Sequence, residues 1–322
     1  MEQKSVLIGM SGGVDSSVAA ALLKEQGYHV IGATMRLWTY SDSCNMKHEG
    51  CCAESAVEDA RRVCDKLGID FYVMNFKDMF KDKVVDYFVD EYIHGRTPNP
   101  CIACNKYLKF DALLKKALAM GIDYVATGHY AKIEKGEDGK YILRASEAVK
   151  KDQSYVLYNF TQEQLAHTLM PLGGYNKDWV RQKAEELGLG VAHKPDSQEI
   201  CFVEDDDYAK FITDYSGYKP KEGDILDVNG NVIGKHRGLI YYTIGQRKGI
   251  GAYGRPMFVM KIDAENNTIT LGEKGMEFSN ELTAYDVNFV SGEFPKENML
   301  ITAKVRYQAP PAAARSEERR VG

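Results

Sequence analysis

The sequence has no apolar run near the ~20 residues that a membrane-spanning helix needs. Its start, Met-Glu-Gln-Lys, does not carry the apolar core of a secretory signal. We therefore expect a cytoplasmic protein with no membrane partner. Hydrophobic residues make up 44% and charged residues 27% of 322 residues, which is ordinary for a globular protein of one large or two to three smaller domains.

The cysteines do not suit a disulfide framework. Their number is odd, and no secretion signal accompanies them, so metal or catalytic use is the open question. They stand at positions 44, 51, 52, 64, 101, 104 and 201. Cys64 is the exception, because Val57, Ala60 and Leu67 share one helical face with it and predict a core position.

Acidic residues are missing from Lys235 to Lys261, although the formal net charge of the chain is -5. The segment carries six basic residues with four aromatic residues between them: Lys235, Arg237, Arg247, Lys248, Arg255 and Lys261, with Tyr241, Tyr242, Tyr253 and Phe258. Such a face can bind phosphates and stack bases, or it can be a solvated rim. The pattern alone leaves both readings open.

A glycine-rich loop follows the apolar run Val6-Leu7-Ile8 and leads into an amphipathic stretch. A Walker-type loop needs a lysine before its Ser/Thr, and Asp15 occupies that place, so the Walker class is excluded. The order strand, glycine turn, helix directs backbone N–H groups and a positive helix end into one concavity that suits phosphate. The alternative is a tight turn without a ligand.

Four apolar runs read as strands, with helices between them: Ser5–Gly9, His29–Met35, Asp70–Phe76 and Asp123–Gly128. The helices include 53–67 and 108–120, and 161–170 and 176–187 follow the fourth strand, with Asn176 as N-cap. Alternating strands and helices predict an α/β doubly wound parallel sheet whose ligands sit at the carboxyl ends of its strands. His129 follows the fourth run and would lie on that rim, in a structural or a functional role.

After the first 207 residues the sequence pattern changes from alternating strands and helices to short apolar runs separated by Gly and Asn. We expect a nucleotide-binding catalytic domain with a helical extension at 1–207 and a β-rich central module at 208–274, because Asn-Gly and similar pairs recur there as hairpin signals. A partial C-terminal β-barrel follows at 275–314. The last eight residues, 315–322, read like a translated sequencing adapter, so we expect a non-native tail that truncates the barrel.

Cysteine chemistry centres on Cys101 and Cys104, which form a CxxC after Pro98 and Pro100. The two prolines predict a non-helical loop that displays both sulfurs. Cys201 lies far along the chain. A thiol ionises at neutral pH only beside positive charge, for which Lys106 and Lys194 are the candidates. A zinc site that combines Cys101 and Cys104 with residues 51 and 52 is the alternative.

The string SGGVDS resembles the PP-loop of the ATP pyrophosphatase superfamily. Together with TPNPCxxCN, GHY, KDQSYVLY, KPDSQEICF and GQRKGIG, it resembles the tRNA-specific 2-thiouridylases (the MnmA/TrmU type) up to about residue 308. The resemblance implies ATP contacts at Gly9, Met10, Ser11, Gly12, Gly13, Val14, Asp15, Ser16, Met35 and Gly128. It implies contacts with tRNA or its target base at Asn99, Pro100, Cys101, His129, Lys151, Asp152, Gln153, Arg306 and Tyr307.

The same resemblance implies the reaction. ATP and Mg²⁺ would support adenylation of O2 of the wobble uridine (position 34) of tRNA. Cys201 would carry a persulfide, loaded by a sulfur-relay protein or a desulfurase, and Cys104 would be the nucleophile that closes a transient disulfide with it. Polynucleotide binding would explain the basic β-rich module.

One departure concerns Cys101, where many family members have Asp. A carboxylate base cannot act there, and three thiolates at 101, 104 and 201 would leave one iron of a [4Fe–4S] cluster open. A cluster is therefore a second route for the sulfur.

Other functions share parts of the pattern. An amidating synthetase of the GMP or NAD type uses the same loop, but it needs an ammonia source and has no use for Cys104 and Cys201. A noncatalytic RNA-binding or iron–sulfur protein and a 4-thiouridine or 2-thiocytidine synthetase are further alternatives.

Overall fold

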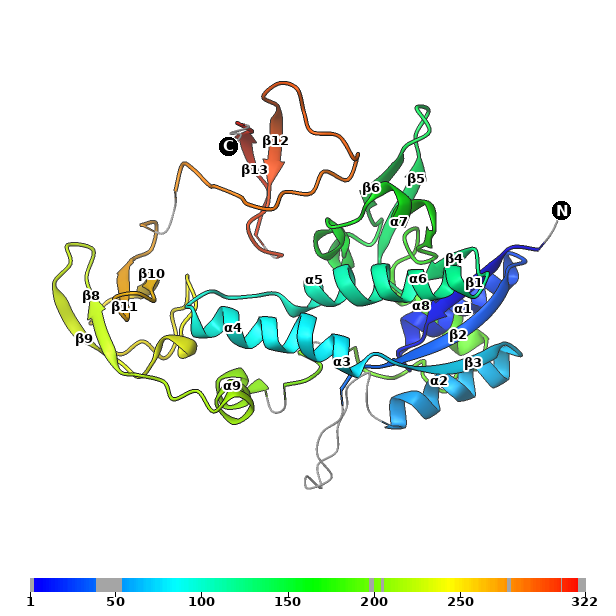
Figure 1. Cartoon of the computed structure of the whole chain (residues 1–322), viewed down its shortest axis with the longest axis horizontal. Helices are drawn as coiled ribbons and strands as arrows, with labels where there is room; N and C mark the ends of the chain where they lie inside the picture. The colour runs from blue at the N-terminus through cyan, green and yellow to red at the C-terminus, as the bar shows by residue number, and fades with distance from the viewer. Residues whose placement is uncertain are drawn as a thin grey trace.

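The computed structural model describes residues 3–38, 54–196, 200–203, 206–276, 279–307 and 309–317 (Figure 1). Its centre is a five-stranded, all-parallel sheet in the order β3-β2-β1-β4-β7. The strands are β1 (Ser5–Gly9), β2 (His29–Arg36), β3 (Asp70–Asn75), β4 (Tyr124–Ala126) and β7 (Thr168–Leu169). In this part of the chain no helix is both long and apolar enough to cross a membrane.

The central strand forms because Val6, Leu7 and Ile8 are apolar without alternation and are fully buried between two layers. Each of the four predicted strands is present, and the first has the predicted bounds. The predicted α/β fold is confirmed.

The fifth strand corrects one prediction. The segment 161–170 was expected to be one helix, but α7 (Gln162–Ala166) ends after five residues and β7 begins at Thr168. Thr161 and Gln164 form a capping box that starts the helix. β7 then pairs with β4, so tertiary pairing at the sheet edge overrides the local helical pattern.

Helices cover both faces of the sheet, as a doubly wound fold requires. One apolar cluster lies between the sheet and α1 (Val14–Glu25), α2 (Glu54–Leu67) and α8 (Lys177–Glu186). Cys64 is fully buried there, as predicted. Asn176 caps α8 by accepting a hydrogen bond from the backbone N–H of Trp179, which also confirms the sequence prediction.

The other face carries two long helices. The first joins α3 (Lys77–Phe80), a π-helical segment η1 (Lys81–Asp86) and α4 (Tyr87–Ile93). The second joins α5 (Pro100–Cys104), a π-helical segment η2 (Asn105–Ala112) and α6 (Leu113–Ala119). Figure 1 shows α4 running from the parallel sheet toward the β-rich module.

A hairpin of β5 (Ala131–Lys135) and β6 (Tyr141–Ala145), which the sequence patterns missed, follows β4. Short 3₁₀ turns follow it at Val149–Lys151 (η3) and Ser154–Leu157 (η4).

The β-rich module is a four-stranded sheet in the order β10-β11-β8-β9. Its strands are β8 (Gly223–Leu226), β9 (Val232–His236), β10 (Met257–Asp263) and β11 (Thr268–Glu273), and η6 (Leu239–Tyr241) is a 3₁₀ turn before β10. Of the four predicted hairpin signals, those at 229–231 and 265–267 lie in the turns that join β8 to β9 and β10 to β11, where Gly230 and Asn267 have positive φ. α9 (Tyr208–Ser216) precedes the four strands of the module and buries Ile212 in the cluster of the two long helices.

Beyond the module, β12 (Leu300–Ala303) and β13 (Ala312–Arg315) form one antiparallel pair. They lie apart from the β8–β11 sheet in Figure 1. The proposed boundaries at 207/208 and 274/275 and the assignment of 315–322 as a tail stay predictions.

Candidate active site

The glycine loop lies where the strand order of the sheet reverses. β1 is flanked by β2 on one side and β4 on the other, all parallel, so their carboxyl ends meet at one edge. Gly9 ends β1, Met35 lies at the end of β2, and Gly128 follows β4. Ligands of doubly wound sheets bind at this switch point.

Two glycines in this edge allow backbone to approach backbone. Gly12 has φ of +70°, and a Cβ there would overlap the Ala56 carbonyl. A Cβ on Gly128 would lie 2.7 Å from the Ser16 nitrogen and 2.8 Å from the Asp15 carbonyl carbon. Both positions therefore require glycine, and the rim after β4 packs directly on the start of α1.

The loop is held by short local contacts. The backbone N–H of Ser11 donates to Ser16 Oγ at 3.2 Å, and Ser17 Oγ donates to the Gly13 carbonyl at 2.8 Å. Gly13 is the N-cap of α1 and makes no side-chain cap, so this helix start has no N-cap side chain to accept from the N–H groups of its first turn. The structure thus gathers the predicted ATP residues at one edge: Gly9, Met10, Ser11, Gly12, Gly13, Val14, Asp15, Ser16, Met35 and Gly128.

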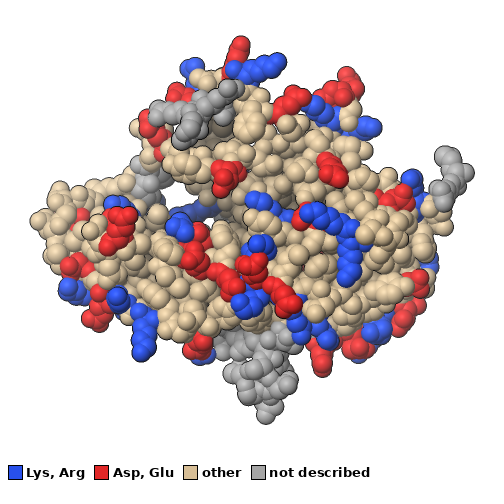
Figure 2. Space-filling model, in the orientation of Figure 1, with Lys and Arg blue, Asp and Glu red and all other residues tan. Residues whose placement is uncertain are grey.

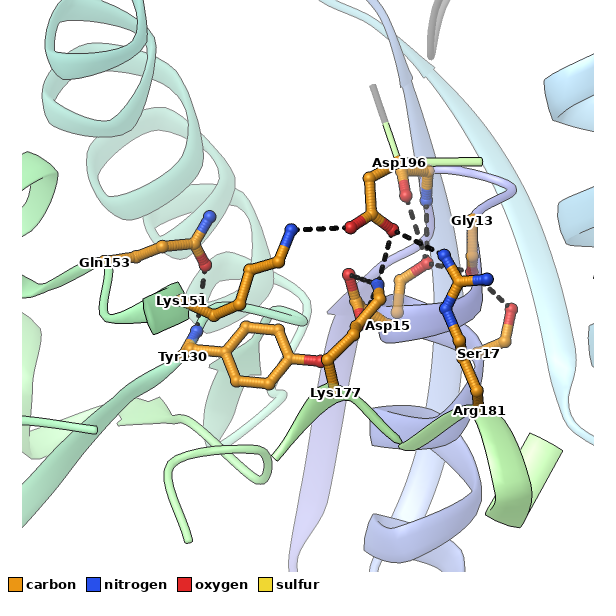
Figure 3. Close-up of polar contacts among 11 residues, drawn as sticks. Gly13, Asp15, Ser17, Tyr130, Lys151, Gln153, Lys177, Arg181 and Asp196 are labelled. Carbon is orange, nitrogen blue, oxygen red and sulfur yellow. Dashed lines mark hydrogen bonds and ion pairs between the residues drawn. The ribbon is translucent and has the colours of Figure 1, made fainter. Parts of the chain in front are cut away.

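An ionic network covers this edge (Figure 3). Lys177 Nζ lies 2.8 Å from each carboxylate oxygen of Asp15 and 2.6 Å from Asp196 Oδ1. The Tyr130 hydroxyl donates to Asp15 Oδ1 at 2.7 Å. Burial, followed by the Asp15 carboxylate, raises the pKa of Tyr130, so this hydroxyl remains a donor.

The Asp196 carboxylate contacts three cationic side chains. Lys151 Nζ lies 2.7 Å from Asp196 Oδ2, and Arg181 lies 3.5 Å from Oδ1. Partial burial acts to raise the pKa of Asp196, but the hydrogen bonds from Lys151 and Lys177 outweigh it and lower the pKa to about 2. The carboxylate is therefore charged throughout the physiological range.

Sequence reasoning missed Tyr130, Lys177, Arg181 and Asp196. Tyr130 and Asp196 lie inside motifs that carried the family resemblance, which was the available signal. Lys177 and Arg181 had none, since a helical lysine and arginine four residues apart usually face solvent.

The side chains of Asp152 and Gln153, predicted to contact tRNA, accept hydrogen bonds from backbone N–H groups in this structure. Asp152 Oδ1 accepts from the backbone N–H of Ser146 at 2.9 Å, and Gln153 Oε1 accepts from that of Tyr130 at 2.9 Å. Both side chains therefore buttress the rim that carries Tyr130.

His129 lies half-buried on the same rim. Its Nδ1 is 2.7 Å from Thr127 Oγ1, and its ring is 5.8 Å from that of Phe110. Burial, together with the positive charge of Lys109, holds the pKa of His129 well below its ordinary value. The imidazole is therefore neutral at neutral pH and can form hydrogen bonds but carries no charge.

The cysteine segment 97–105 corrects a second prediction. Residues 97–99 are irregular, but 100–105 are helical, because Pro100 occupies the first position of α5, where its missing N–H costs nothing. Asn99 caps this helix by accepting from the backbone N–H groups of Cys101 and Ile102. Cys101 is exposed, whereas Cys104, on the inner face, is only 8% exposed.

Cys104 and Cys201 border the same apolar cluster. Cys104 is one of its buried members and Cys201 packs against it. Lys194, expected beside a thiol, instead contacts the Gly12 carbonyl at 3.2 Å and Asp59 at 2.9 Å. Lys106 lies over the ring of Tyr107.

A three-cysteine iron site is not formed here. Within the described ranges, no three His, Cys, Asp or Glu side chains are grouped so that they could hold a metal ion. Cys101, Cys104 and Cys201 all belong to those ranges, so their placement does not fit a cluster. Residues 44, 51 and 52, including the other half of the alternative zinc site, lie outside the described residues.

The predicted tRNA residues Arg306 and Tyr307 lie at the meeting point of three parts of the chain. Arg306 donates to the Ile244 carbonyl of the β-rich module at 2.5 Å, and Tyr307 packs edge-on to Tyr155 at 6.1 Å. The structure does not bring them to the glycine loop.

The basic stretch 235–261 is partly neutralised by its fold. Lys235 pairs with Asp224, Arg255 with Glu273 and Lys261 with Asp263. Figure 2 shows basic and acidic side chains interspersed on one face. Asp224 and Glu273 come from other strands, so the local charge pattern did not reveal them, whereas Asp263 lies two residues beyond Lys261 on β10. Arg247 and Arg255 line a cavity of about 350 Å³ in this module.

Thiol labelling tests the burial of the cysteines. We expect iodoacetamide to modify Cys101 rapidly, because it is exposed, and Cys104 far more slowly. Cys64 should remain unlabelled, because burial, with the charge of Asp65, raises the pKa of its thiol to about 12. Peptide mass spectrometry over a time course measures the order, and urea-unfolded protein is the control in which all three react alike. Equal rates in the folded protein would contradict the described burial.

Comparisons with known proteins identify relatives along nearly all of the chain. A family model described as the tRNA methyl transferase HUP domain matches residues 4–205, and one described as the tRNA methyl transferase PRC-barrel domain matches residues 209–273. The tRNA-specific 2-thiouridylase MnmA of Clostridioides difficile (strain 630) is 59% identical over 313 residues, 97% of this chain and 86% of the relative. That of Acetivibrio thermocellus is 58% identical over 317 residues, 98% of this chain and 88% of the relative.

Solved structures resemble the chain only distantly. A 4-thiouridine synthetase in complex with RNA and bound ATP has a TM-score of 0.40 and 17% identity, and the match covers 60% of this chain and 43% of that one. A predicted subunit of tRNA methyltransferase from Methanocaldococcus jannaschii has a TM-score of 0.34 and 19% identity, over 57% and 75% of the two chains.

Proposed function

The chain belongs to the tRNA-specific 2-thiouridylase family, and we propose that it is an enzyme that uses ATP to replace O2 of the wobble uridine (position 34) of tRNA with sulfur. The observation that carries the proposal is the presence of a glycine loop for a nucleotide at the edge of the parallel sheet, together with two cysteines, Cys104 and Cys201, that border one apolar cluster. An enzyme that only adenylated its substrate would need the loop and not the thiols.

Adenylation is the first step. O2 of the uridine attacks the α-phosphorus of ATP, the bond to the β-phosphate oxygen breaks, and pyrophosphate leaves. The backbone at Gly12 and Gly13 and the N-terminus of α1 would stabilise the phosphates by N–H donors and by the helix dipole. Such transfers depend mainly on positioning and on charge stabilisation.

The residues present fit Mg²⁺, which takes one or two carboxylates together with phosphate oxygens. Asp15 is the carboxylate at the loop, and it would hold the ion jointly with the nucleotide. The ion supplies neutralisation of the phosphate charge.

Sulfur transfer follows. The terminal sulfur of a Cys201 persulfide attacks C2 of the activated uridine, and AMP leaves with the former O2. Cys104 thiolate then attacks Cys201 Sγ, which breaks the persulfide S–S bond, leaves the thiocarbonyl on the base and forms a Cys104–Cys201 disulfide. The sulfane sulfur gains two electrons, the two thiols lose them, and an external thiol reductant restores both cysteines.

The partners follow from this chemistry. tRNA is the substrate, and a sulfur-relay protein or a desulfurase supplies the persulfide. Asn99, Pro100, Cys101 and His129 would face the target base, and Asp152, Gln153, Arg306 and Tyr307 would lie along the tRNA. A neutral, partly buried His129 suits recognition of an unstacked base. Free tRNA and reduced thiols are consistent with a cytoplasmic location.

Nucleoside mass spectrometry tests the proposal. Purified protein, ATP, a persulfide donor and unmodified tRNA should yield 2-thiouridine at position 34, with AMP and pyrophosphate in equal amounts. The reaction without ATP is the control. Formation of 4-thiouridine, of 2-thiocytidine or of no thionucleoside would overturn the proposal.

A further inference from the structure

Three cationic side chains lie beside the glycine loop. The family resemblance assigned none of them to ATP, and Asp15 is the one ATP residue that takes part in their network. Lys177 and Arg181 lie on α8, four residues apart and therefore on one helical face. Lys151 reaches the same place from η3 (Figure 3). Lys177 is the most enclosed of them, with 12% of its side chain exposed.

The charges of this group do not balance. Lys177, Arg181 and Lys151 carry three positive charges, and Asp15 and Asp196 carry two negative ones. The N-terminus of α1, where Asp15 sits, adds the positive end of a helix dipole. The site therefore favours a further anion.

The carboxylates set the geometry of the cations. Lys177 Nζ is shared between Asp15 and Asp196 at 2.6–2.8 Å, so its position at the start of α1 is defined to the precision of a hydrogen bond. A purely structural ion pair needs one carboxylate for one cation. Here the Lys177 ammonium contacts both Asp15 and Asp196, and the Arg181 guanidinium also contacts Asp196. A polyphosphate has oxygens enough to replace both carboxylates at once.

We propose that Lys177 and Arg181, with Lys151, form the pyrophosphate subsite of the nucleotide site, and that Asp15 and Asp196 hold these cations in place until the β- and γ-phosphates of ATP replace them. The inference deepens the proposed function and depends on it for the identity of the nucleotide. The ligand class is a polyphosphate: ATP or free pyrophosphate binds here, whereas AMP does not reach the subsite. Lys177 would then stabilise the charge that develops on the leaving pyrophosphate.

Binding measurements on Lys177→Met test the subsite. Titration calorimetry with ATP, pyrophosphate and AMP separates the subsite from the rest of the nucleotide site. We expect affinity for ATP and for pyrophosphate to fall about 10- to 100-fold, the effect of losing charged hydrogen bonds, and affinity for AMP to stay within about twofold. Lys183→Met is the matched control, because Lys183 lies on the same helix but pairs with Glu25 at the far end of α1, and it should bind all three ligands normally.

Two further variants exclude a merely structural role. Asp196→Asn removes one competitor for Lys177, so we expect pyrophosphate and ATP to bind several-fold more tightly, with AMP unchanged. Asp15→Asn/Lys177→Met removes both charges of the partly buried pair, so its melting temperature should approach that of the wild type while pyrophosphate binding stays weak. Wild-type pyrophosphate affinity in folded Lys177→Met, an equal loss for AMP, or weaker binding in Asp196→Asn would overturn the subsite.

The same experiments distinguish the subsite from the proposed function. If wild-type protein makes no 2-thiouridine but loses pyrophosphate binding on Lys177→Met, the function fails and the subsite stands. If wild-type protein makes 2-thiouridine and Lys177→Met binds pyrophosphate normally, the subsite fails.

Discussion

Cys104→Ser and Cys201→Ser are each expected to lower 2-thiouridine formation at least about 1,000-fold while ATP binding stays at the wild-type level. A serine hydroxyl at position 201 cannot carry the persulfide, and one at position 104 cannot open the persulfide bond. The two losses differ in kind. Cys104→Ser should accumulate a persulfide on Cys201 that mass spectrometry detects as one added sulfur, whereas Cys201→Ser should show none.

Cys64→Ala is the control for this pair. Cys64 is buried under the opposite face of the sheet and acts as a small apolar side chain, so the variant should keep its activity per folded molecule. An amidating synthetase would keep its turnover in Cys104→Ser/Cys201→Ser. Substantial thiolation by either single variant would exclude the proposed sulfur transfer.

Gly128→Ala is expected to reduce ATP affinity and to lower thiolation about 100-fold, because the methyl group displaces the loop that positions the nucleotide. The new Cβ would lie 2.7 Å from the Ser16 nitrogen, and backbone at the start of α1 cannot rotate away as a flexible side chain could. Overpacking of this kind costs about 1–3 kcal/mol of stability. Calorimetric ATP titration, together with thermal unfolding, measures both effects.

Gly174→Ala is the matched control, since a Cβ there meets nothing within 4 Å and its φ is not positive. It should leave stability within about 0.5 kcal/mol and ATP affinity unchanged. Gly128→Ala with wild-type ATP affinity would contradict the close approach of the rim to α1.

Local patterns predicted most of the parallel sheet because their causes are local. The apolar run at Val6–Ile8 specifies a buried strand, and Asn176 specifies a helix start by a hydrogen bond three residues away. The predictions that were wrong concern segments whose local pattern fits two structures about equally well. Pro100 can break a helix or begin one. Here it begins one, because the Asn99 side chain caps the N-terminus of α5. Thr168 and Leu169 continue a helical pattern, yet they became strand because β4 offered a free edge.

The partners of charged side chains were beyond local patterns. Lys177 and Asp15 are 162 residues apart and meet because α8 packs beside α1. Lys235 and Arg255 read as part of a basic face, but each pairs in the folded module with a carboxylate from another strand. Charge attraction is weak compared with burial, so the packing of apolar faces selects which charges become neighbours.

The sequence by itself determined the nucleotide loop, the succession of strand, glycine turn and helix around it, and the two cysteines that suggest sulfur chemistry. These features depend on residue type and short spacing. Only the tertiary structure decided that Cys104 is buried and Cys101 exposed, that three cysteines do not gather as an iron site, and that Lys177 and Arg181 join Asp15 and Asp196. Those outcomes depend on how helices dock on the sheet, and docking is set by the shape of apolar surfaces far apart in the chain.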